Sequence, residues 1–369
     1  MDSSKNKFLQ LVRSGLWGTV PPVSLFDELT DWNDIYNLSK QQAVLGVALD
    51  GINLLPANLR PPRLLYLKWC AEVLEIEDEN HRLDKEMINL FSLLEENGSR
   101  PVLMKGQGVA RNYPYPLHRT SGDIDIFVGK EDYDKVNNLL AIDGKALEKW
   151  SPKHLMFEWH DVVVENHRLM VKLNNPATDK KIQRIIDDWY LNGKTDEIII
   201  EGYKITLPPI DFDLVFLLLH SVVHLMGFGV GLRQVCDWAM MLHTRKGEIN
   251  KQNVLKILKK LGLVSAARIF GALSVKYLGL PEEDLVIPFK KSDIRYADQL
   301  LNDIWYNGNF GFSGERIKKR PGGYVVARLY NLFNTARRAY RLSKIAPGEA
   351  LWAPYVKFTQ YFLSRWDKN

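Results

Sequence analysis

The chain has 369 residues, of which 46% are hydrophobic and 25% are charged. This composition excludes a disordered or fibrous chain, and the length favours two or three globular domains. The net charge of +5 at pH 7 is compatible with an anionic partner but does not indicate one. Two cysteines are too few for a disulfide framework.

Residues 1–95 are predicted to form an N-terminal helical domain. Apolar residues recur at helical spacing through this region, and the pairs Pro21–Pro22 and Pro61–Pro62 separate its segments. The first residues lack the apolar run of a secretory signal. No motif here carries chemistry, so we expect a scaffold or a lid.

Residues 96–210 mix strands with helices. The sequence favours strands at 101–105, 123–128, 155–159 and 162–169, a helix at 131–140, and a hairpin at 198–207 that turns near Gly202. We therefore expect an α+β domain, built on a mixed sheet with flanking helices, in the middle of the chain.

Residues 211–369 are predicted to form a C-terminal helical domain. Asp211 or Asp213 can cap an apolar helix that runs through Met226, and a second helix is predicted at 234–243. The longest apolar stretch, 214–226, is too short to span a bilayer. We expect a cytoplasmic protein with no integral membrane segment.

Two aspartates mark the strand at 123–128. Successive strand residues alternate faces, so Asp123 and Asp125 share one side while Ile124 and Ile126 point to the core. Carboxylates about 6.5 Å apart suit oxygen ligation of one or two hard cations, which would also relieve their repulsion. The pattern predicts a Mg²⁺ or Mn²⁺ site; a solvent-facing strand with alternating acids is the alternative.

The residues before these aspartates favour a phosphate-bearing substrate. Lys105 and Gly106 close the preceding strand, where an ammonium and exposed N–H groups could hold phosphate oxygens. Arg119 lies four residues before Asp123 and could also reach a phosphate. Gly122 permits a close backbone approach or a sharp turn.

Together, Lys105–Gly106 and the run from Arg119 to Val128 resemble the DNA polymerase β-like nucleotidyltransferase superfamily. The resemblance is closest to a bacterial branch of largely uncharacterised nucleotidyltransferases, related to abortive-infection and toxin–antitoxin transferases. It covers about residues 100–170, and a looser likeness extends to about residue 243. The usual Gly-Ser turn of the superfamily is replaced here by Lys105-Gly106-Gln107-Gly108.

The resemblance implies a nucleotidyltransferase-like sheet, two acidic metal ligands and a third acid from a later strand. We choose Glu165 as the third acid because it lies within an apolar strand; Asp161 and Glu158 are the competitors. His167 shares the face of Glu165 and could orient a carboxylate or contact substrate, although a structural histidine is an equal alternative.

The implied activity is transfer of a nucleoside monophosphate from a triphosphate such as ATP to an acceptor hydroxyl, by a two-metal mechanism. The acceptor stays open between a small molecule, a protein and an RNA. A catalytically inactive nucleotide- or partner-binding protein that retains the fold is the first alternative.

A zinc enzyme using His220 and His224 is the second alternative, because histidines at i and i+4 share a helix face. Ser221, however, stands where a metalloprotease has glutamate. We favour a structural or cleft-lining role for both histidines, with Arg233 and Asp237 lining the same substrate cleft.

Basic residues crowd the segment 316–344, with Glu315 the only acid at 311–345. They are Arg316, Lys318, Lys319, Arg320, Arg328, Arg337, Arg338, Arg341 and Lys344. An apolar stripe of Val325, Leu329, Leu332, Ala336 and Tyr340 is predicted to be buried. The opposite, basic face could contact RNA phosphates or an acidic membrane; an ordinary solvated surface is the alternative.

Overall fold

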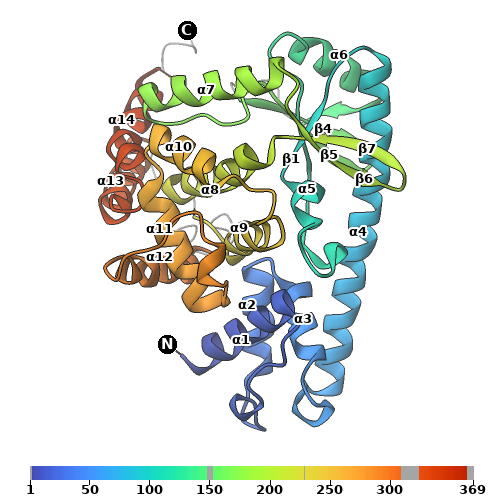
Figure 1. The fold of residues 1–369 in the computed structure, drawn as a ribbon, viewed down its shortest axis with the longest axis vertical. Coiled ribbons are helices and arrows are strands. Elements are labelled where there is room, and N and C mark those ends of the chain that lie inside the picture. Colours follow the sequence, from blue (N-terminus) through green and yellow to red (C-terminus); the bar gives the residue numbers. More distant parts are fainter. Residues whose placement is uncertain (1, 148–152, 228, 309–323, 364–369) are drawn as a thin grey trace. The chain divides into compact units, whose positions relative to one another are not determined.

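Helices and a small mixed sheet make up the computed structural model, which describes residues 2–147, 153–227, 229–308 and 324–363 (Figure 1). The predicted α+β class is confirmed. The chain divides into two compact units. The first comprises Met1–Lys172, Gln183–Asp213 and Thr244–Glu248, and the second Leu173–Ile182, Leu214–His243 and Ile249–Asn369. The three domains expected from the sequence stay a prediction.

The first unit opens with the predicted helices. They are α1 (Ser3–Trp17), α2 (Trp32–Gln41), α3 (Leu45–Asn53) and α4 (Arg63–Glu96), with short 3₁₀ turns at Val23–Leu25 and Ala57–Leu59. Glycine allows α1 and α3 to touch, because a Cβ on Gly51 would lie 2.0 Å from the Leu11 carbonyl oxygen.

Five strands form the central sheet, in the order β1-β2-β5-β4-β3. They are β1 (Val102–Met104), β2 (Ile124–Phe127), β3 (Lys145–Ala146), β4 (His154–Trp159) and β5 (Val162–His167). The β2–β5 pair is parallel and the other pairs are antiparallel. Figure 1 shows α4 as one long helix beside these strands.

One face of the sheet is the core of the first unit. Ile124 and Ile126 of β2 and Val164 of β5 are fully buried there, as the strand alternation predicts. The apolar side of α4 packs against them, together with residues of helix α6 (Tyr133–Asp143). The opposite face carries Asp125 and Phe127, which are 3% and 2% exposed, so it is covered as well.

The remaining elements of the first unit include the predicted hairpin. They are α5 (Gly106–Ala110), a 3₁₀ turn at Pro116–His118, β6 (Asp196–Ile200) and β7 (Tyr203–Leu207); α7 (Pro176–Leu191) is shared between the units. Glu201 and Gly202 both have positive φ, which is the backbone of a tight two-residue hairpin turn. The predicted turn near Gly202 is confirmed.

The second unit is helical. Its elements are α8 (Ile210–Gly227), α9 (Leu232–Thr244), α10 (Lys251–Leu261), α11 (Val264–Leu273), a π-helical turn at Ser274–Leu278, a 3₁₀ turn at Glu282–Asp284, α12 (Asp293–Asn307), α13 (Tyr324–Leu342) and α14 (Pro347–Leu363). By length and composition α8 is the one described helix that could cross a membrane alone, but 67% of its window is buried inside the protein, as a core helix would be.

The predicted buried stripe on α13 is wrong. Leu329 is 62% exposed and Tyr340 is 85% exposed, whereas Arg338 is buried. The Arg338 guanidinium donates to the Asp303 carboxylate of α12 at 2.5 and 3.2 Å and to the Leu225 carbonyl. The buried side of α13 therefore carries Arg338, Ala339 and Leu342 and differs from the side that hydrophobic spacing alone predicts.

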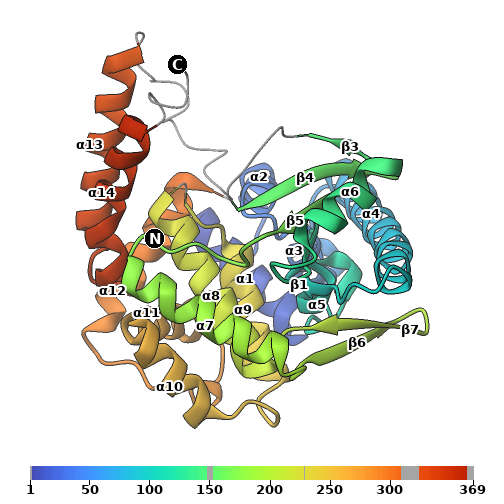
Figure 2. The ribbon, with the colours of Figure 1, turned by 90° about the horizontal axis from the view of Figure 1, so that it is seen from above.

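The burial of Arg338 also removes one cation from the expected basic face. Helices α13 and α14 lie side by side in Figure 2, within the second unit. Four further members of the basic segment, Arg316, Lys318, Lys319 and Arg320, lie outside the described residues. Contact of this segment with RNA stays a prediction.

Candidate active site

Three carboxylates converge at the neighbouring strands β2 and β5 of the sheet. Asp123 lies immediately before β2, Asp125 lies within it, and strand register places Asp125 beside Glu165 of the parallel neighbour β5. One carboxylate oxygen from each of the three lies within 4.8 Å of the others. The structure thus brings together the three acids chosen from the sequence.

The two competing acids lie elsewhere on the same hairpin. Asp161 is exposed at the turn between β4 and β5, with a φ of 64°, and Glu158 is exposed on β4. Neither joins a group of three or more metal-ligand atoms among the described residues. The geometry therefore favours Glu165 as the third acid.

Lys105 neutralises the buried carboxylate of Asp125. Its Nζ lies 2.7 Å from Asp125 Oδ2, and the two side chains are 18% and 3% exposed. Burial raises the pKa of Asp125, but Lys105 and His167 outweigh it and hold that pKa below its usual value. Burial lowers the pKa of Lys105, but Asp125 and Asp123 raise it overall.

The backbone of Lys105 is strained. Its φ of 57° and ψ of −137° lie in a region that residues other than glycine rarely adopt. The next residue, Gly106, has a φ of 47° and starts the short helix α5. This conformation lets the chain leave β1 while the ammonium turns back to Asp125.

His167 is the second side chain that contacts the acids. Its Nε2 lies 2.7 Å from Asp125 Oδ1 and 3.2 Å from Glu165 Oε2, and its side chain is buried. Burial lowers the pKa of His167, but the hydrogen bonds with Asp125 and Glu165 raise it above its usual value. The structure therefore places His167 where it orients both carboxylates.

The sequence reasoning missed His154, which lies opposite His167 in the β4–β5 register. Their ring centroids are 4.9 Å apart, and His154 Nδ1 lies 3.9 Å from Glu165 Oε2. The sequence held a signal for this pairing. A two-residue turn at His160–Asp161 pairs residue 159 with residue 162, and continuing the antiparallel register along both strands pairs residue 154 with residue 167.

The segment leading into Asp123 is held by buried polar contacts. Arg119 is 5% exposed and donates from its guanidinium to the Ser121 hydroxyl at 3.0 Å. The Asn80 amide of α4 donates to the Arg119 carbonyl at 3.0 Å. Gly122 was expected at a close backbone approach or a sharp turn. Apart from its chain neighbours, no described atom lies within 4 Å of where its Cβ would be, so there is no close approach.

His118 anchors the same segment between two helices. Its Nδ1 lies 2.7 Å from Asp50 of α3 and its Nε2 2.7 Å from Glu77 of α4. Burial lowers the pKa of His118, but the hydrogen bonds to Asp50 and Glu77 raise it overall. Burial raises the pKa of Asp50 and outweighs its pairing with His118.

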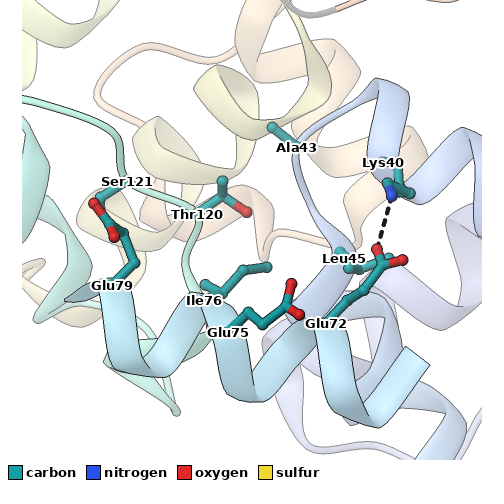
Figure 3. Close-up of a pocket in the computed structure, with 9 residues that line it drawn as sticks. All are labelled: Lys40, Ala43, Leu45, Glu72, Glu75, Ile76, Glu79, Thr120 and Ser121. Carbon is teal, nitrogen blue, oxygen red and sulfur yellow. Dashed lines mark ion pairs between the residues drawn. The ribbon is translucent and has the colours of Figure 1, made fainter. Parts of the chain in front are cut away.

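A cavity of about 290 Å³ lies where this segment meets α4 (Figure 3). Its lining residues are Lys40, Ala43, Leu45, Glu72, Glu75, Ile76, Glu79, Thr120 and Ser121. Lys40 Nζ pairs with Glu72 at 2.8 Å and Arg82 pairs with Glu79 at 3.1 Å, so these glutamates are partly neutralised. The sequence reasoning found no chemistry in this region, since the cavity exists only where the fold lays residues 120–121 on α4.

The remaining predicted cleft residues belong to the second unit. His220 and His224 lie one turn apart on α8 with ring centroids 4.3 Å apart, and Arg233 and Asp237 lie on α9. Within the described residues, neither histidine belongs to a group of three or more metal-ligand atoms. Their role in a substrate cleft stays a prediction.

Comparison with known proteins points to one family. A family model described as an uncharacterised nucleotidyltransferase matches residues 28–279. A nucleotidyltransferase-like antigenic protein from Paracoccidioides brasiliensis is similar in structure over 58% of this chain and 96% of that chain, with 12% identity and a TM-score of 0.34. No curated protein matches the chain.

Proposed function

The chain belongs to the uncharacterised nucleotidyltransferase family, and on that premise we propose that it transfers a nucleoside monophosphate from a nucleoside triphosphate to an acceptor hydroxyl. The observation that carries the proposal is the convergence of Asp123, Asp125 and Glu165 on one face of the sheet. Three carboxylates in reach of one another fit Mg²⁺ or Mn²⁺, which prefer oxygen ligands.

These carboxylates would hold the divalent cations of a two-metal site. Such ions lower the pKa of an attacking hydroxyl and neutralise charge on departing pyrophosphate. Asp123 would contribute an oxygen from the residue before β2, Asp125 from β2 itself and Glu165 from β5. The strand pairing fixes the spacing of the acids before any ligand arrives, as an in-line displacement requires.

The other residues of the site would position these acids and meet the phosphates. His167 holds Asp125 by a hydrogen bond of 2.7 Å and so fixes the orientation of its carboxylate. Lys105, at the end of β1, carries the ammonium nearest the acids and would offset charge on the triphosphate. Arg119 is buried and would act by holding the segment that ends at Asp123, through Ser121.

The test is incorporation of label from each nucleoside triphosphate, with Mg²⁺ or Mn²⁺ and cell extract as the source of acceptor. Asp123→Asn should abolish incorporation while circular dichroism stays unchanged. Asp125→Asn should do the same, although it also removes the partner of Lys105. Glu158→Gln, an exposed acid on the same hairpin, is the matched control and should retain activity.

Undiminished incorporation by Asp123→Asn would refute the site. Metal-dependent nucleotide binding without any labelled product, across small-molecule, protein and RNA acceptors, would instead support a binding protein that keeps the fold. The identity of the labelled molecule would define the acceptor.

A further inference from the structure

A second group of metal-ligand atoms lies beside the three carboxylates. His154, Glu165 and His167 each place one ligand atom within 4.8 Å of the other two. Glu165 is common to both groups, and a carboxylate has two oxygens with which to bridge neighbouring ions. Of its two histidines, His167 also holds Asp125 for the proposed transfer, whereas His154 has no role in that transfer.

We propose that His154, Glu165 and His167 form a separate subsite for a borderline divalent cation such as Zn²⁺, joined to the carboxylate group through Glu165. Imidazole nitrogen and carboxylate oxygen together are a common donor set for Zn²⁺, whereas Mg²⁺ selects oxygen. The inference depends on the proposed function only in that the neighbouring carboxylate group is taken as the nucleotidyltransferase site.

The spacing of the donor atoms supports a four-coordinate ion. Ligand atoms about 2.1 Å from a tetrahedral zinc lie roughly 3.4 Å from one another. The separations to Glu165 Oε2 are 3.2 Å from His167 Nε2 and 3.9 Å from His154 Nδ1. Two ligands of an octahedral Mg²⁺ lie closer, at about 2.9 Å.

The strands hold these donors in place. Residues 154 and 167 are direct cross-strand partners, and Glu165 lies two positions from His167 on the same face. The side chains are 24%, 16% and 8% exposed for His154, Glu165 and His167, so the site is partly shielded and still reachable. An ion there would take the place of the proton that His167 Nε2 shares with the carboxylates.

The experiment uses the full chain stripped of metal, without nucleotide. Co²⁺ is titrated while visible absorption is recorded, because four-coordinate Co²⁺ absorbs strongly, and Zn²⁺ is titrated by calorimetry. His154→Ala should lose the Co²⁺ band and weaken Zn²⁺ binding by at least about tenfold. His154→Gln repeats the test should the alanine variant fail to fold.

Two variants separate this site from its surroundings. His160→Ala, on the turn of the same hairpin and paired with Glu86, should bind Co²⁺ as the wild type does. Asp123→Asn removes a member of the carboxylate group alone and should also keep the Co²⁺ band.

The proposal is overturned if His154→Ala binds Co²⁺ and Zn²⁺ as tightly as the wild type, because the histidines would then form only a hydrogen-bonded cluster. It is equally overturned if His160→Ala loses the band to the same extent. Failure of nucleotidyl transfer is scored separately, by label incorporation with Mg²⁺ in Asp123→Asn and the wild type. Either conclusion can therefore fail without the other.

Discussion

Replacing Lys105 by methionine tests whether the ammonium balances the buried Asp125. The change keeps an unbranched side chain one atom shorter and removes the charge 2.7 Å from a carboxylate that is 3% exposed. Breaking a fully buried pair costs about 3–5 kcal/mol. Lys105 is 18% exposed and His167 still donates to Asp125, so we expect a loss of about 2–3 kcal/mol in the free energy of unfolding.

The measurement is urea denaturation at neutral pH with a metal chelator, combined with hydrogen exchange of the β2 peptide, because the two units need not unfold together. Lys105→Gly should be more stable than Lys105→Met by about 1 kcal/mol, since glycine tolerates the φ of 57°. Lys130→Met, which breaks an exposed pair with Asp187, should cost less than about 1 kcal/mol. Equal stability of wild type and Lys105→Met would refute the charge balance.

Three further predictions concern stability. Burial raises the pKa of Asp213 to about 7, so the folded state keeps a proton that the unfolded state releases. The free energy of unfolding of the wild type should therefore fall by up to about 4 kcal/mol as pH rises from about 4 to about 7, and urea titrations of Asp213→Asn should not show this fall. The raised pKa of His118 gives a contribution to the free energy of unfolding that is complete below about pH 6.5 and is lost as pH rises through the folded-state pKa. In thermal melts the stability of His118→Gln should therefore not show this decline with pH. Gly51→Ala should lower the free energy of unfolding by about 1–3 kcal/mol or more, because the new Cβ would overlap the Leu11 carbonyl. An unchanged denaturation midpoint would show that α1 and α3 can move apart without loss of stability.

The aspartate pair could be predicted because strand alternation is a local rule. Asp123 and Asp125 share a face whatever the rest of the chain does, and buried Ile124 and Ile126 confirm that rule. Glu165 was chosen because an acid inside an apolar strand needs a compensating partner. The parallel register with β2 then places it beside Asp125.

The parts that were missed depend on distant partners. Hydrophobic spacing put Tyr340 inside, but the structure buries Arg338 because Asp303, 35 residues earlier, neutralises it. The strained φ of Lys105 has no signature in residue types, because lysine has no preference for positive φ. Such features arise from tertiary contacts and are invisible to periodicity.

Lys105 and His167 affect the metal-free site and metal binding in opposite ways. The Lys105 ammonium offsets the repulsion among the carboxylates, and the His167 ring lies within hydrogen-bond distance of Asp125 and Glu165. An incoming divalent cation must then compete with these two side chains for the same oxygens. In calorimetry, Lys105→Met should therefore bind Mg²⁺ or Mn²⁺ more tightly than the wild type, even though its metal-free form is less stable. Saturating metal should then reduce the difference in free energy of unfolding between the variant and the wild type. Weaker metal binding in this variant would show that the Lys105 ammonium positions the Asp125 carboxylate for the ion and does not compete with the ion for that carboxylate.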